Sequence, residues 1–162
     1  NRYFRDAFIS YVHYKENGEI APIRVDGVGV GQYDAAQGKI EAEDYFNING
    51  LEKTEIPSGG FSVRTIGGKG WVAYPNVNNL NSFTHIHLDL IFFEQSSGVI
   101  DIRKNTPTGE RLAVQKVENG EPSKKSISFP INTTNKTENI IISIEGFENG
   151  QLAIDSFHFT KE

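Results

Sequence analysis

Short apolar segments that alternate with polar residues at a period of two constrain the fold of this chain most. Residues 84–93, THIHLDLIFF, place successive side chains on opposite faces of an extended strand. One face is apolar (Ile86, Leu88, Leu90, Phe92), and the other carries His85, His87, Asp89, Ile91 and Phe93. This pattern is typical of a strand with one face in a core and the other towards solvent.

The pattern recurs in VIDIRK, RLAVQKV, SISFPI, NIIISIEG and LAIDSFHF. Turn-forming stretches such as ENGEP, TNKTEN and FENGQ separate these segments. No segment shows a sustained helical repeat, and nothing indicates the crossover helices of a parallel sheet. The sequence therefore predicts an all-β fold, an antiparallel β-sandwich of the jelly-roll type.

Composition excludes several classes of function. The chain has 162 residues, which is enough for one domain with its own core. Its net charge is -5 and its Lys and Arg residues are scattered, so nucleic acid is not an expected partner. It has no cysteine, which excludes disulfides and cysteine-ligated zinc. The apolar runs LDLIFF and IIISI are strand-sized, so we expect no membrane-spanning segment.

Residues 1–36 differ from the rest. FISYVHYKENGEIAPIRV predicts a hairpin that turns at residues 16–19, because Asn-Gly tolerates the positive φ of tight turns. GVGVGQYDAAQG has no periodicity and predicts a linker. We therefore divide the chain into a hairpin and linker (1–36) and a sandwich (37–162). The chain begins NRYFRDAF, without Met or a signal peptide, so we expect it to be a piece of a longer protein.

An acidic cluster stands in KIEAEDYFNING, residues 39–50. Glu41 and Glu43 are two residues apart, so in a strand both carboxylates would emerge on one face and repel each other. Three interpretations remain open at this point: a solvated acidic edge, a pair of glycosidase carboxylates, or a metal site. Among metals, Ca²⁺ favours carboxylate and carbonyl oxygens.

Three stretches, KIEAEDYFNINGLEKTE, GGFSVRTIGGKGWVAY and GQLAIDSFHF, resemble in order and spacing those of family 6 carbohydrate-binding modules. The resemblance covers about residues 38–160. The opening FRDAFISYVHYKENGEIAPI resembles, more weakly, the last strands of a glycoside hydrolase family 43 catalytic domain. The resemblance implies a structural Ca²⁺ held by Glu41, Glu43 and Asp155, which ties the first strand of the sandwich to the last.

In such modules sugar commonly binds at the loop edge of the sandwich, between two aromatic rings and beside an Asn. The resemblance places the first ring at Thr65 and the Asn at Ala153, while NGEPSKKSIS, where the second ring belongs, has no aromatic residue. An acidic residue near the first loop, Glu55 or Glu52, is retained. We therefore expect this cleft not to bind sugar in the usual way.

A second sugar site of the family lies on the concave face of a sheet, where Trp71 matches an aromatic platform. Alternation places Ala73 on the same face as Trp71, and we expect His87, Asp101 and Arg103 to surround this ring with polar groups. The alternative is that Trp71 fills the core or an edge. His85 and His87 share a face, which permits a transition-metal site, although the sequence indicates no third ligand.

Together these features predict a non-catalytic module that binds polysaccharide or oligosaccharide. We expect it to target an attached hydrolase, xylosidase-like or arabinofuranosidase-like, to xylan, arabinan or related plant polysaccharide. The resemblance implies a bacterial protein that is secreted, periplasmic or at the cell surface. The alternative is a structural module that has lost sugar binding and packs against the upstream catalytic domain.

Overall fold

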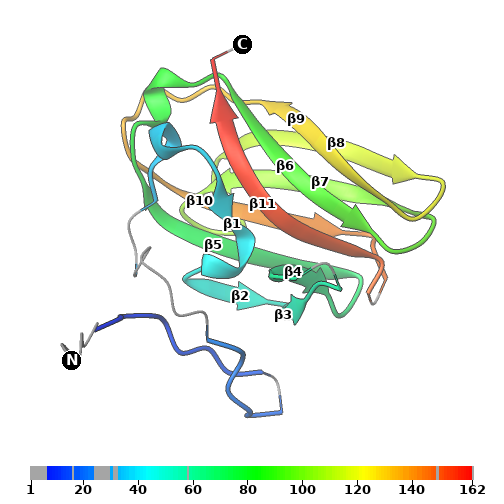
Figure 1. The fold of residues 1–162 in the computed structure, drawn as a ribbon. Helices are drawn as coiled ribbons and strands as arrows, with labels where there is room; N and C mark the ends of the chain where they lie inside the picture. Colours follow the sequence, from blue (N-terminus) through cyan, green and yellow to red (C-terminus); the bar gives the residue numbers. More distant parts are fainter. Residues whose placement is uncertain are drawn as a thin grey trace.

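The computed structural model describes residues 7–15, 17–23, 30, 33–57, 59–148 and 150–161. The sandwich consists of two antiparallel β-sheets (Figure 1). In the first, called the β11 sheet, the strand order is β3-β4-β11-β6-β9, and the short β1 also pairs with β11. In the second, called the β10 sheet, the order is β2-β5-β10-β7-β8. The predicted all-β antiparallel sandwich is confirmed.

The β11 sheet consists of β1 (Ile40–Glu41), β3 (Leu51–Glu55), β4 (Phe61–Thr65), β6 (His85–Phe92), β9 (Ser123–Pro130) and β11 (Leu152–Thr160). The β10 sheet consists of β2 (Asn47–Asn49), β5 (Lys69–Val77), β7 (Ser96–Lys104), β8 (Arg111–Asn119) and β10 (Glu138–Glu145). Three single turns of 3₁₀ helix complete the described part: η1 (Ala35–Gln37), η2 (Ala42–Asp44) and η3 (Leu80–Ser82). No described helix has the length and apolar character needed to cross a membrane.

The core lies between the two sheets and is built by the alternating apolar residues. In β10, Ile140, Ile142 and Ile144 are buried, whereas Ser143 between them faces outwards. The rings of Tyr74 and Phe157 meet edge to face across the sandwich, with centroids 4.6 Å apart. Each fully buried apolar side chain contributes about 1.5–3 kcal/mol, so this layer is the main source of stability.

The N-terminal segment, residues 7–23, turns back on itself and contacts the sandwich. Tyr14 and Ile20 form an antiparallel bridge, and the turn between them contains Gly18 at φ 84°. The ring of His13 packs on Tyr45 at 4.1 Å between centroids, and that of Tyr11 meets Phe46 edge on at 5.6 Å. Burial against these rings lowers the pKa of His13 below its ordinary value. Several apolar side chains of the segment stay exposed: Phe8, Ile9, Val12, Tyr14, Ile20 and Ile23.

The sandwich core extends further towards the N-terminus than the division at residue 36 allowed. Tyr33 and Ala35, which that division assigned to the linker, are buried in the core. Asp34 between them bridges to Asn78 and accepts hydrogen bonds from the side-chain amide of Asn79. The remaining linker residues before Tyr33 lie outside the described residues, apart from Val30.

Gly98 in β7 provides a test of this packing. A Cβ atom at Gly98 would overlap the buried ring of Phe147 and lie 2.5 Å from Glu145 O. We expect Gly98→Ala to destabilise the fold by about 1–3 kcal/mol, the range for overpacking a core. Urea unfolding measures the change. Gly120→Ala is the matched control, because no atom lies within 4 Å of its Cβ position, and equal stability of the two variants would contradict the assigned packing.

Candidate functional site

The acidic cluster is held in place from the core by two tyrosines. Residues 42–44 form the single turn η2 and not a continuation of β1. The buried Tyr74 hydroxyl donates to Ala42 O at 2.8 Å, and the Tyr33 hydroxyl donates to Asp44 O at 2.5 Å. Burial raises the pKa of both hydroxyls, so they remain neutral donors. The backbone that carries the carboxylates is therefore fixed at both ends of the turn.

The two glutamates do not emerge from one strand, so the geometric reason given for their proximity is wrong. Glu41 ends β1 and its side chain is 29 % exposed, whereas Glu43 lies within η2 and is buried. Asp155 lies at a register shift of β11, between Ile154 and Ser156. Such irregularities re-aim a side chain. All three predicted metal ligands nevertheless line one hollow of about 360 Å³.

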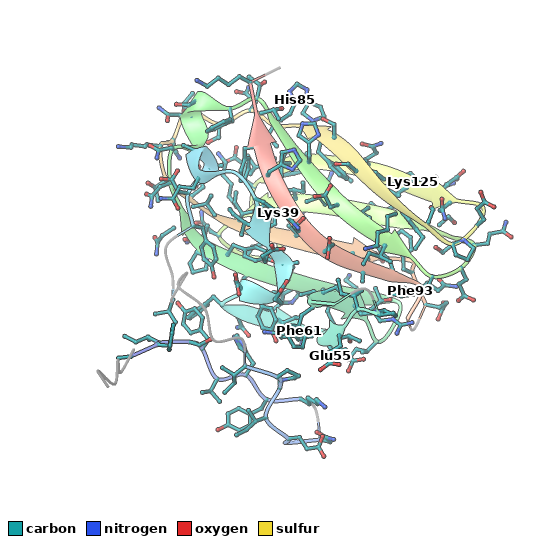
Figure 2. All side chains as sticks on the ribbon, in the orientation of Figure 1. Lys39, Glu55, Phe61, His85, Phe93 and Lys125 are labelled. Atoms are coloured by element: carbon teal, nitrogen blue, oxygen red, sulfur yellow. The ribbon has the colours of Figure 1, made fainter. Side chains whose placement is uncertain are left out.

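A lysine ammonium approaches two of these three carboxylates. Lys39 Nζ lies 3.2 Å from Glu41 Oε2 and 3.9 Å from Asp155 Oδ2 (Figure 2 labels Lys39). Burial acts to lower the pKa of Lys39, but the hydrogen bond and charge of Glu41 and the charge of Asp155 outweigh it and raise the pKa. Within the described residues, no three acidic or histidine side chains are arranged to hold a metal ion. The pair thus attracts a cation, and Lys39 supplies one.

The loop-edge cleft is closed at the two positions that the sequence analysis singled out. Thr65 is buried, and its hydroxyl donates to Glu148 O at 2.9 Å. Ala153 is also buried and packs with Ile56, Ile91 and Phe93. Neither side chain reaches solvent, so neither is available to a sugar.

Arg64 holds the loop at Gly150 against this edge by hydrogen bonds. The Arg64 guanidinium donates to Gly150 O at 2.9 Å and lies 4.1 Å above the ring of Phe93. No sequence pattern indicated this stacking, because Arg64 lies in β4 and Phe93 follows the end of β6. Glu55, the acidic residue expected near this cleft, is exposed at the end of β3.

The outer face of the β10 sheet brings most of the other predicted residues together. Trp71 is partly exposed there, and Ala73 shares its face. Cross-strand pairing forms one outward row of Asn49, Trp71, Ser143, Asp101 and Val114. The next row is Asn47, Ala73, Ile141, Arg103 and Arg111. Trp71, Ala73, Asp101 and Arg103 therefore lie on one surface, and Trp71 is not a core residue.

Asp101 is fixed in this surface by two arginines. Arg103 Nη2 lies 2.7 Å from Asp101 Oδ2, and Arg111 donates to both carboxylate oxygens at 3.1 and 3.0 Å. Arg111 was not among the predicted residues, although its place opposite Arg103 follows from the β7–β8 hairpin register. Two-pronged pairing of this kind sets the orientation of all three side chains.

Two hollows adjoin the ring of Trp71. The larger, of about 480 Å³, is lined by Trp71, Asp101, Arg103, Pro107 and Arg111, among others. The smaller, of about 250 Å³, is lined by Trp71, Phe46, Asn47, Pro107 and Asn139, among others. Trp71 and Pro107 border both, so the ring lies in the wall between two depressions with apolar and polar lining. This is the mixture that sugar sites require.

His87 does not belong to this surface, and its predicted place beside Trp71 is wrong. It lies in β6, paired with β11, on the outer face of the opposite sheet. Period-two alternation shows that His87 faces away from Ile86 and Leu88, but it does not show which sheet carries the strand. Figure 2 labels His85 at the start of this strand and Phe93 just after its end.

No family model and no curated protein sequence matches the chain. Solved structures do. A family 6 carbohydrate-binding module from Clostridium stercorarium, in complex with cellobiose, aligns with a TM-score of 0.67 over 82% of this chain and 98% of its own, at 23% identity. The family 6 module from Clostridium cellulolyticum, in complex with xylose, gives a TM-score of 0.67 over 76% and 96%, at 20% identity. The chain has the fold of the family 6 carbohydrate-binding modules.

A glycoside hydrolase family 43 arabinoxylan arabinofuranohydrolase from Bacillus subtilis, in complex with cellotetraose, also matches. Its TM-score is 0.68 at 14% identity, and the match covers 94% of this chain but only 33% of the enzyme. The share of this module-like chain that aligns is thus larger for the enzyme than for the isolated modules.

The tyrosine that supports the acidic turn offers a test. Tyr74→Phe leaves the buried Ala42 carbonyl without its donor, so we expect a loss of about 1–3 kcal/mol in unfolding free energy. Urea unfolding followed by circular dichroism measures it. Tyr14→Phe, at an exposed ring, is the control and should have no effect. An unchanged midpoint for Tyr74→Phe would contradict the role of Tyr74 as an anchor of η2.

Proposed function

We propose that this chain is a non-catalytic carbohydrate-binding module whose sugar site is the outer face of the β10 sheet around Trp71. The partly exposed ring of Trp71, between two depressions, is the observation that carries the proposal. A pyranose presents a face of C–H groups that packs well on an aromatic ring. Asp101, held by Arg103 and Arg111, then places hydrogen-bonding groups beside the stacked sugar.

The charged network suits a polar ligand for a further reason. Asp101 and Arg103 are each about four-fifths buried at the side chain, whereas half of the Arg111 side chain is exposed. The Arg111 guanidinium is thus held by a carboxylate while half of the side chain remains exposed to solvent. Groups held in this way lose little conformational freedom when they bind a sugar hydroxyl.

We further propose that the module is attached to a glycoside hydrolase and directs it to plant polysaccharide. The wider match to the arabinofuranohydrolase supports this, because it takes in 94% of the chain against 82% for the first module. Weak binding by a tethered module raises the effective concentration of the active site at its substrate. Plant polysaccharide is a substrate outside the cell, so we propose a secreted, periplasmic or cell-surface setting.

The proposal also includes a structural Ca²⁺ at Glu41, Glu43 and Asp155. The donor set matches the oxygen ligands that Ca²⁺ prefers. Glu41 and Asp155 already approach one cation, the ammonium of Lys39. Occupancy requires Lys39 to move away, so we expect the lysine to compete with Ca²⁺ for the carboxylates.

The sugar site is tested by Trp71→Ala. We expect this change to weaken binding by about 2 kcal/mol or more, a factor of roughly 30, as for aromatic hot spots that a ligand covers. Affinity gels with xylan, arabinan, agarose and β-glucan, together with tryptophan fluorescence titration of the parent chain, measure it. Tyr14→Ala, which removes an exposed ring elsewhere, is the control, and the affinity gels should retain it as strongly as the parent chain.

The alternative is a structural module that packs against a catalytic domain without binding sugar. The buried Thr65 and Ala153 and the exposed apolar residues of segment 7–23 favour it. Failure of all four polysaccharides to retain the parent chain, with no change in Trp71 fluorescence, would select this alternative over sugar binding.

The calcium site is tested by melting. A ligand that binds only the folded state at 100 times its Kd adds about 2.7 kcal/mol, so chelator should lower the Tm of the Ca²⁺-loaded parent chain. Asp155→Asn should remove the response, and Lys39→Gln should lower the Ca²⁺ concentration needed for it. Glu145→Gln, at an exposed acid on β10, is the control. If neither Ca²⁺ nor chelator changes the Tm of the parent chain or of Lys39→Gln, the proposed calcium site is wrong.

A further inference from the structure

Three of the four histidines of the chain gather on the outer face of the β11 sheet, away from the site around Trp71. His85 and His87 come from β6, and His158 comes from β11. The rings of His87 and His158 are stacked, with centroids 4.8 Å apart and planes inclined by 8°. The ring of His85 follows at 6.5 Å from that of His87.

The backbone holds these three positions firmly. Antiparallel pairing places His158 directly opposite His87, and alternation brings His85 to the same face two residues away. Their neighbours along the two strands are buried in the core: Ile86 and Leu88 in β6, and Phe157 and Phe159 in β11. The Cβ atoms of the three histidines are therefore fixed by packing, and only the rings are able to turn.

Imidazole nitrogens at such positions are ligands for divalent transition metals. Neutral imidazole is the commonest protein ligand of such ions, and three histidines with an open fourth position form a known zinc set. The sequence indicated His85 and His87 as a chelating pair without a third ligand. The register of β11 provides it as His158.

We infer that His85, His87 and His158 form a surface site for a divalent transition-metal ion, with Zn²⁺ as the representative case. The site is distinct in chemistry from the carboxylates around Asp155, because imidazole suits zinc, copper and nickel whereas carboxylates suit Ca²⁺. The bound ion joins β6 to β11 and leaves at least one coordination position open to solvent or to a ligand.

Binding requires the rings of His85 and His87 to move. His85 Nδ1 is hydrogen-bonded to Thr84 Oγ1 at 3.0 Å, and His87 Nε2 to Thr160 Oγ1 at 2.9 Å. As the rings lie, no three histidine or acidic side chains of the described residues surround a common point. Metal binding therefore requires His85 and His87 to leave the two threonines and to turn towards a common point with His158, and water then replaces the hydroxyl partners at this surface.

The neighbouring carboxylate on this face is already engaged. Asp89, two residues after His87, accepts a hydrogen bond from Ser156 Oγ at 2.8 Å. The proposed donor set is the three imidazoles, without Asp89. A set of this kind binds Ca²⁺ poorly, which allows the two proposed ions to be told apart.

The test is calorimetric titration of the metal-free chain with ZnCl₂ at neutral pH, in excess CaCl₂. One Zn²⁺ per chain is expected. Loss of an outer-shell partner already costs about 10–100-fold in metal affinity, so we expect at least that loss for His158→Ala and His87→Ala. His13→Ala is the matched control, since His13 packs on Tyr45 in the N-terminal segment, and it should bind Zn²⁺ like the parent chain.

Two further measurements make each result decisive. NMR of the histidine rings should show Zn²⁺-dependent shifts of His85, His87 and His158 and none of His13. Asp155→Asn should bind Zn²⁺ unchanged, and weakened binding there would assign the ion to the carboxylates and overturn the inference. Absence of saturable binding, or equal effects of His13→Ala and His158→Ala in variants with the urea midpoint of the parent chain, would also overturn it.

Discussion

The antiparallel pairing of β11 is the constraint on which the chemistry of this molecule depends. This strand pairs with β1, β4 and β6, and most of its residues are buried. Through these pairings it brings Asp155 near Glu41, Ala153 beside Arg64, and His158 opposite His87. Three groups of residues distant in sequence therefore acquire their neighbours from one register. A slip of one residue would send every one of these side chains to the other face.

The two outer faces that result differ in the way that their charges are compensated. On the β10 sheet, two arginines pair with Asp101 in a two-pronged arrangement, so its charge is compensated and its side chain is held in one orientation. On the β11 sheet, Glu41 and Asp155 share the single ammonium of Lys39 at longer distances. That compensation is weaker, because one ammonium serves two carboxylates without two-pronged geometry. This difference is the basis for proposing a neutral polar ligand on the first face and an added cation on the second.

Period-two alternation was sufficient to predict the sandwich, and it placed Trp71 with Ala73 on one face of β5 and Asp101 with Arg103 on one face of β7. That the two pairs share one surface depends on the pairing of β10 with β5 and β7. Alternation failed for His87 because the pattern assigns a residue to a face of its strand, while the order of strands depends on long-range pairing. It also failed for Glu43, since the hydrogen bonds of Tyr33 and Tyr74 hold a 3₁₀ turn where spacing alone suggested a strand. The burial of Thr65 depends on the loop around Gly150, more than eighty residues away in sequence, which no local pattern reveals.

The position of the N-terminal segment bears on how a tethered module would work. Tyr11 packs on Phe46, and Phe46 lines the smaller hollow beside Trp71. A catalytic domain that precedes this segment would therefore join the module close to the face proposed to hold sugar, rather than at the opposite sheet. The effective concentration of bound polysaccharide at the active site falls as the connection between the two sites lengthens. This placement therefore favours delivery of the bound polysaccharide to the neighbouring active site. The exposed apolar side chains of the segment would then be covered by the same domain, and one interface would fix both the orientation and the reach of the module.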